Sequence, residues 1–196
     1  ETAVRLLEIT TYEWETYLAS HGSTAVAGVD EVGRGALAGP LMAGAVILPE
    51  PDEIMQEIDF WTTVRDSKTI SVNRRAILAE GIIQRARSWA LGTVEADELD
   101  QIGVAAANRT AMERAVWGLN IEPDFLLIDA TTIDLPQPQL GIIDGDALSL
   151  SIAAASIIAK VARDSIMIEL DTVWPGYGFA SHKGYAAKAH REAIRS

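Results

Sequence analysis

The sequence predicts an α/β protein in which helices flank a mixed central β-sheet. Short apolar runs bounded by turn residues are typical of buried strands, and they occur at 24–29, 41–48 and 125–128. Longer segments with helical periodicity lie at 73–86, 98–119 and 148–170. Strands that first come as a pair and are then separated by helices favour one layered domain around one core.

The N-terminal part is predicted to contain a helix followed by an antiparallel strand pair. Residues 3–20 place apolar side chains such as Leu7 and Leu18 near one helical face. The strand at 24–29 is followed by a glycine-dense loop at 31–39, and a second strand follows. A strand–loop–strand unit of this kind favours antiparallel pairing.

The rest of the chain is predicted to alternate helices and strands. Regions 50–60, 65–72 and 135–141 are expected to be connections, and 87–95 is expected to be a strand. Asp97 is a suitable N-cap for the helix at 98–119. Aromatic turns and a short final helix are expected in the segment 174–196.

Composition excludes several classes of protein and site. The chain has no cysteine, so disulfides and thiolate metal sites are absent, which suits a reducing compartment. Its apolar runs at 41–48 and 152–159 are too short to span a bilayer, and no signal peptide opens the sequence. We expect a cytoplasmic protein without membrane contact, and nothing in the sequence demands more than a monomer.

The net charge of −12 argues at first against a nucleic-acid partner, since phosphate binding usually needs a basic face. The charge is unevenly distributed, however. The stretch 50–59 holds five acids and no base, whereas 178–196 holds four bases and one acid. A solvated basic tail and a phosphate-binding strip both fit this pattern, so charge alone leaves the partner open.

Four acidic residues stand beside apolar elements. Asp30 and Glu31 follow the first predicted strand, Asp129 ends another, and Asp146 precedes the helix at 148–170. Unpaired charges are costly there, and a hard divalent cation such as Mg²⁺ relieves that cost with oxygen ligands. Taken singly, each acid also fits a turn or a helix cap.

The neighbouring acids Asp30 and Glu31 raise a geometric problem. Adjacent residues on a regular strand face opposite ways, so these two carboxylates are expected to converge only if the strand breaks there. Gly33 and Gly35 allow such a break, or Glu31 contributes its backbone carbonyl instead.

Four stretches, in this order along nearly the whole chain, resemble the bacterial ribonuclease HII family. They are Val26-Ala27-Gly28-Val29-Asp30-Glu31-Val32-Gly33-Arg34-Gly35 with Leu37-Ala38-Gly39-Pro40, then Asp66-Ser67-Lys68, then Gly145-Asp146 with the run 151–164, and Tyr177-Gly178-Phe179 with His182-Lys183-Gly184-Tyr185. Four ordered motifs are far more specific than a lone glycine loop.

The resemblance implies a ribonuclease H-like fold with a small helical C-terminal portion. It divides the chain into a catalytic domain at 1–172 and a C-terminal segment at 173–196 that contributes substrate contacts. It also implies an endoribonuclease that cuts 5′ of ribonucleotides embedded in duplex DNA or in RNA–DNA hybrids. The catalytic and metal-binding set for Mg²⁺ or Mn²⁺ would be Asp30, Glu31, Asp129 and Asp146.

The resemblance further implies which residues read the substrate. The 2′-hydroxyl distinguishes a ribonucleotide, and the implied contacts to sugar and phosphate are Gly33, Arg34, Gly35, Lys68, Lys183 and Tyr185. Without the motifs, Arg34 fits a structural salt bridge better than a substrate contact, and Tyr185 fits a half-buried core position equally well. Asp164 lies four residues after Lys160 and is expected to pair with it rather than with a metal.

The sequence departs from the family pattern in two places. Asp144 stands where the family commonly carries a basic residue, so it adds negative charge close to the implied metals and is expected to weaken metal binding or phosphate approach. The family's short basic tail after the last helix is absent, so we expect weaker duplex affinity. Two other functions remain open. A DNA nuclease or resolvase of the same fold would lack 2′-hydroxyl sensing, and a hybrid-binding module would bind without turnover.

Overall fold

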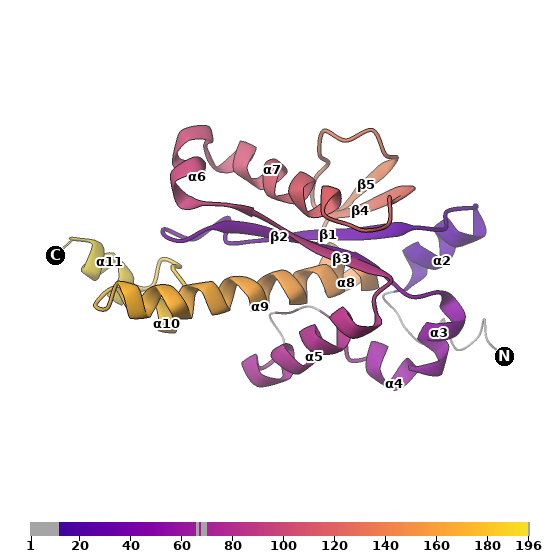
Figure 1. Ribbon diagram of the computed structural model, residues 1–196, viewed down its shortest axis with the longest axis horizontal. Helices are drawn as coiled ribbons and strands as arrows, with labels where there is room; N and C mark the ends of the chain where they lie inside the picture. The colour runs from indigo at the N-terminus through magenta and orange to yellow at the C-terminus, as the bar shows by residue number, and fades with distance from the viewer. Residues whose placement is uncertain (1–11, 66, 68–69, 196) are drawn as a thin grey trace.

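The computed structural model describes residues 12–65, 67 and 70–195, and a mixed β-sheet forms its centre (Figure 1). The described strands are β1 (Val26–Val32), β2 (Leu41–Ile47), β3 (Ser88–Val94), β4 (Phe125–Asp129) and β5 (Gln139–Ile142). Their order in the sheet is β3-β2-β1-β4-β5. The pairs β1–β2 and β2–β3 are antiparallel, whereas β1–β4 and β4–β5 are parallel. The predicted mixed sheet is therefore confirmed.

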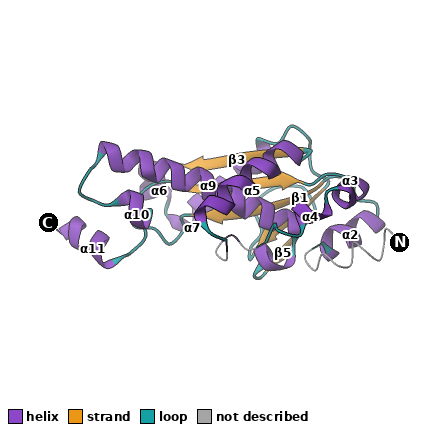
Figure 2. Cartoon of the chain, turned by 90° about the horizontal axis from the view of Figure 1, so that it is seen from below, coloured by secondary structure: helices purple, strands orange, loops and turns teal. Residues whose placement is uncertain are grey.

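Helices cover both faces of the sheet, as Figures 1 and 2 show. The long helix α9 (Leu150–Val173) packs on β1 and β2, and α5 (Val72–Arg85) packs against α9. The helix α7 (Val104–Trp117) covers the opposite face through β3, β2 and β1. Buried apolar side chains fill both layers, so the sheet lies between two halves of the core.

Small residues let α9 lie unusually close to the central strands. A Cβ atom added at Gly28 of β1 would lie 2.1 Å from the backbone carbon of Ser151, and one at Gly44 of β2 would lie 2.5 Å from the Ala155 oxygen. Only glycine leaves room for such an approach. The contact brings the polar positions of α9 directly over the end of β1.

Several predicted boundaries were wrong. The expected connection at 50–60 contains two helices, α3 (Pro51–Gln56) and α4 (Ile58–Trp61), and Glu50 and Glu53 form a capping box at the start of α3. The expected helix at 98–119 is broken at Gly103, so α6 (Ala96–Ile102) precedes α7, and Glu95 rather than Asp97 is the N-cap of α6. The expected loop at 135–141 contributes the edge strand β5.

The remaining helices are short. They are α2 (Glu13–Ser20), α8 (Gly145–Leu148), α10 (Phe179–His182) and α11 (Lys188–Arg195). The expected helix at 3–20 lies partly outside the described residues. None of the described helices combines the length and apolar character that crossing a membrane requires.

Candidate active site

The strand β1 runs without a break through the first acidic pair. Asp30 pairs with Gly44 and Glu31 with Ala43 of β2, and β1 ends only at Val32. The expectation that these acids follow the strand, and need a break in it, was therefore wrong. The parallel pairing of β1 with β4 ends earlier, at Val29. Asp30 thus lies beside Asp129, the last residue of β4, and Glu31 lies one residue beyond.

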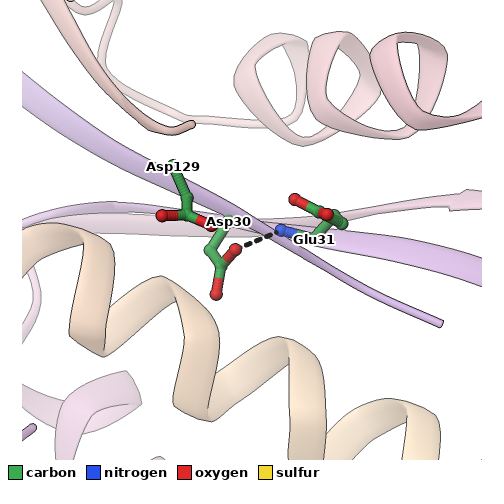
Figure 3. A group of neighbouring side chains, drawn as sticks. All are labelled: Asp30, Glu31 and Asp129. Carbon is green, nitrogen blue, oxygen red and sulfur yellow. Dashed lines mark hydrogen bonds between the residues drawn. The ribbon is translucent and has the colours of Figure 1, made fainter. Parts of the chain in front are cut away.

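Three carboxylates meet at this point (Figure 3). One ligand oxygen from each of Asp30, Glu31 and Asp129 lies within 4.8 Å of the others. Asp129 is the last residue of β4, which runs parallel to β1, so the carboxyl ends of the two strands bring it beside the pair. The Asp30 carboxylate turns back along its own strand, and its Oδ1 accepts the Glu31 backbone N–H at 2.8 Å. This turn allows two adjacent strand residues to face the same point.

Burial strongly perturbs the Asp30 carboxyl. Its residue is only 6% exposed, and burial raises its pKa well above the ordinary value. A hydrogen bond from the Ser156 hydroxyl on α9 lowers the pKa, while the charges of Glu31, Asp129 and Asp146 raise it further. Negative charge is therefore concentrated here and only partly compensated by the protein.

Asp146 lies beside this group but is not one of the three. It is buried on α8, where Asp144 rather than Asp146 is the N-cap. The preceding residue, Gly145, donates its N–H to Asp129 Oδ1 at 2.7 Å, which ties α8 to the end of β4. The Asp146 charge reaches Asp30, since it raises the pKa of that carboxyl.

A cleft of about 430 Å³ opens in front of the carboxylates. Its walls come from the loop after β1, from Ser67, from Ser156 and Lys160 of α9, and from Tyr185. Gly33 and Gly35 line it for different reasons. Gly33 has φ +98°, and a Cβ there would lie 2.4 Å from Arg163 Nε, whereas a Cβ at Gly35 would meet no protein atom within 4 Å. The fold requires glycine at 33, but it leaves open space at 35.

Tyr185 lines the cleft beside the glycine loop. Its backbone forms an isolated bridge with Ala36, and two cations face its ring. Lys160 Nζ is 5.4 Å and the Arg163 guanidinium carbon 5.3 Å from the ring centre. Arg34, on the same loop as Ala36, lies 3.7 Å from Glu31 and has a side chain that is 61% exposed. A contact this long leaves the guanidinium accessible from the cleft.

Of the two predicted phosphate-binding lysines, Lys183 lies within the described residues. The Lys183 ammonium donates to the Ala180 carbonyl and so caps α10, and its own carbonyl accepts from Arg163. Lys68 and Asp66 lie outside the described residues. Lys160 Nζ contacts Asp164 Oδ1 at 2.7 Å, which confirms the predicted local pairing of these two residues.

Sequence reasoning missed several polar residues around the cleft. Ser156 bonds to both Asp30 and Ser67, and the buried Arg75 donates to the carbonyl oxygens of Ser67 and Ile70. A signal for part of this set was present. Ser156, Lys160 and Arg163 are spaced four and three residues apart, so they share one helix face within an otherwise apolar run.

Solved structures define the class of protein. The chain matches the ribonuclease H2 from Pyrococcus horikoshii OT3 with a TM-score of 0.74 and 25% identity, over 87% of this chain and 85% of that one. It matches the PCNA:RNase HII complex structure from Archaeoglobus fulgidus with a TM-score of 0.70 and 25% identity, over the same shares of the two chains. The fold is that of a ribonuclease H-like nuclease.

Sequence comparison defines the family. The model of the family described as Ribonuclease HII matches residues 27–196. The ribonuclease HII of Dehalococcoides mccartyi strain 195 is 48% identical over 92% of this chain and 84% of its own. That of Caulobacter vibrioides strain NA1000 is 50% identical over 89% of this chain and 80% of its own. The chain belongs to the ribonuclease HII family, and it is an endoribonuclease that acts on RNA–DNA hybrids.

Proposed function

We propose that this enzyme hydrolyses the phosphodiester on the 5′ side of a ribonucleotide, either embedded in duplex DNA or within an RNA–DNA hybrid. The products are a 3′-hydroxyl and a 5′-phosphate. The observation that carries the proposal is the cleft, in which three converging carboxylates lie beside a glycine loop with open space at Gly35. Carboxylates supply the hydrolytic site, and the open loop supplies the place for a sugar.

The carboxylate group fits a hard divalent cation. Its ligands are oxygens, they lie within 4.8 Å of one another, and burial raises the pKa of Asp30. We propose that Asp30, Glu31 and Asp129, with Asp146 alongside, hold Mg²⁺ or Mn²⁺. Such an ion supplies Lewis acidity and an activated water for phosphodiester hydrolysis. Asp146 is placed to influence the protonation of this group through its charge on Asp30.

The surrounding residues orient the nucleic acid. We assign backbone groups of Gly33 and Gly35 to the ribose, because the 2′-hydroxyl both donates and accepts hydrogen bonds. Tyr185 offers an aromatic face across the cleft, and the exposed Arg34 offers a phosphate contact. Phosphate contacts position a duplex without reading sequence, and we assign Lys68 and Lys183 to that role.

The wider organisation follows from these assignments. Residues 1–172 act as the catalytic domain, and the segment 173–196 contributes substrate contacts through Tyr185. We propose that the protein works as a monomer, since nothing in the sequence demands a second copy. We place it in the cytoplasm, where a cysteine-free chain has no need of oxidising conditions.

Cleavage of a duplex that carries one ribonucleotide tests the proposal. With Mg²⁺ present, the wild type is expected to cut that duplex and leave an all-DNA duplex of the same sequence intact. Asp30→Asn is expected to lose roughly 1,000-fold or more in rate, while Asp59→Asn, the same change at an exposed position on α4, retains full activity. Equal cutting of both duplexes would favour a DNA nuclease, and metal-independent binding without turnover would favour a binding module.

A further inference from the structure

Arg163 of α9 is buried with 0% exposure, although its guanidinium carries a charge. Each of its three side-chain nitrogens donates to a backbone carbonyl. Nε donates to Pro40 at 2.8 Å, Nη1 to Lys183 at 2.8 Å and Nη2 to Ala38 at 3.1 Å. Burial lowers the pKa of this guanidinium, yet arginine keeps its proton in proteins. A charge held this deeply by carbonyl groups stabilises a particular arrangement of backbone.

The three acceptor carbonyls belong to two segments far apart in the sequence. Ala38 and Pro40 belong to the loop between β1 and β2, whereas Lys183 precedes Tyr185 by two residues. The same segments also meet directly, because Leu37 donates its N–H to the Gly184 oxygen at 2.8 Å. Arg163 therefore joins the loop after β1 to the segment that carries Tyr185.

Tyr185 and Gly33, which are both assigned to substrate contacts, lie against this junction. The Arg163 guanidinium faces the Tyr185 ring at 5.3 Å, within the range of a cation–π contact. The same guanidinium also packs against Gly33, because a Cβ added there would lie only 2.4 Å from Arg163 Nε. One side chain thus touches both walls of the place where the sugar enters.

We propose that Arg163 is a positioning residue that sets the spacing between Tyr185 and the glycine loop, and with it the enzyme's ability to sense a ribose. The inference rests on the proposed function. Each guanidinium nitrogen is bound to protein, so Arg163 acts through Tyr185 and the loop. A misplacement of about 1 Å costs on the order of 100-fold in rate, because the reacting groups leave their productive geometry.

A double-mutant cycle between Arg163 and Tyr185 tests this role. Arg163→Lys keeps the charge but loses the planar fork that binds three carbonyls. Its kcat on the one-ribonucleotide duplex is expected to fall about tenfold or more, while KM changes less than about threefold. Tyr185→Ala is expected to show a loss of the same order, and the double variant is expected to lose little beyond the worse single variant, since the two residues act as one unit.

Two further measurements separate positioning from a purely structural role. The ratio of dissociation constants for the one-ribonucleotide and all-DNA duplexes, measured without divalent metal, is expected to approach one in Arg163→Lys. Arg114→Lys is the control, because Arg114 also donates to a backbone carbonyl, that of Thr93, but does so from α7 on the opposite face of the sheet. Its effect is expected to be small and independent of Tyr185.

The outcomes are distinguishable. If the wild type leaves the one-ribonucleotide duplex uncut, the proposed function fails, and this inference fails with it. If the wild type cuts, but the effects of Arg163→Lys and Tyr185→Ala multiply, the positioning role alone is overturned. Should Arg163→Lys fail to fold, Gly184→Ala tests the same junction, because its Cβ would lie 2.2 Å from the Ala38 oxygen and force the segments apart. An undiminished kcat in Gly184→Ala would overturn the proposal.

Discussion

The two glycines of the cleft loop allow a paired test, in which one substitution is expected to lower stability and the other to lower activity. Gly33→Ala and Gly35→Ala each add one methyl group, two residues apart on the same loop. At Gly33 the methyl group meets protein, whereas at Gly35 it meets open space in the cleft. The first change is expected to damage the fold and the second to damage the function.

The magnitudes follow from the local geometry. Gly33 has φ +98°, and its added Cβ would lie 2.4 Å from Arg163 Nε and 2.8 Å from the Pro40 oxygen. A side chain in that backbone region costs about 1–3 kcal/mol before any clash is counted. Gly33→Ala is therefore expected to lower Tm by roughly 4 °C or more, at about 2–4 °C per kcal/mol for a chain of this size.

Gly35→Ala is expected to leave stability unchanged or to raise it. No protein atom lies within 4 Å of the added Cβ, and φ lies outside the region that disfavours side chains. Replacing glycine at such a position stabilises by about 0.4–1 kcal/mol, because the unfolded chain loses freedom. The same methyl group projects where the ribose is proposed to approach. A loss of about tenfold or more in kcat/KM on the one-ribonucleotide duplex is expected.

Thermal unfolding and steady-state cleavage are measured on the same preparations of wild type and both variants. A Gly35→Ala enzyme that unfolds like the wild type but cuts poorly would place the substrate at this loop. Retention of kcat/KM within about threefold would refute the reasoning, because a methyl group in the path of the sugar cannot be neutral. An equal loss of Tm in both variants would show that the space at Gly35 is filled.

Other predictions follow from the buried carboxyl groups. Since the pKa of Asp30 is raised in the folded state, its neutral form favours folding at low pH, and that stability is lost as pH rises from about 4 through the folded pKa. In urea unfolding, metal-free Asp30→Asn is therefore expected to match the wild type below about pH 4 and to exceed it increasingly as pH rises toward about 8. Ser156→Ala removes the hydrogen bond that lowers this pKa, so the acid limb of the pH–kcat profile is expected to move to higher pH; an unmoved limb would contradict the assignment. Glu15 accepts from the Ser151 N–H at 2.8 Å and the Ser149 hydroxyl at 2.7 Å, so Glu15→Ala is expected to lose about 2–3 kcal/mol in urea unfolding with kcat unchanged.

The layers of the fold were predictable from the sequence because buried strands and long helices leave strong periodic signals. The short elements were not. The edge strand β5 contains Gly141 and follows a proline-rich connection, and its pairing with β4 arises from tertiary contact rather than from its own pattern. The helix at 98–119 has continuous periodicity, and only the backbone at Gly103, with φ +78°, shows where it divides.

The site was predicted as a set of acids, but its geometry was not. A regular strand argues that Asp30 and Glu31 diverge, and the sequence contains no sign that the Asp30 carboxylate turns back to accept the Glu31 amide. The parallel register that brings Asp129 beside them is likewise a long-range property. The spacing of Arg163 with Ser156 and Lys160 is visible in the sequence, but its role is not, since the carbonyls that it binds lie more than 120 residues before it and 20 after it.

The overall charge of −12 is compatible with a nucleic-acid substrate because opposite charges lie at opposite ends of the molecule. The acidic stretch 50–59 forms α3 and α4 near one end, whereas the basic residues of α11 lie at the other (Figure 1). The strand β1 runs from the acidic end toward the basic end, so its carboxyl end opens toward the cations of the C-terminal segment. The negative charge that remains in the cleft belongs to the clustered carboxylates, where a divalent cation offsets it. The electrostatic potential that an approaching phosphate meets therefore depends on the charged residues near the cleft, and the net charge of the whole chain is a poor guide to it.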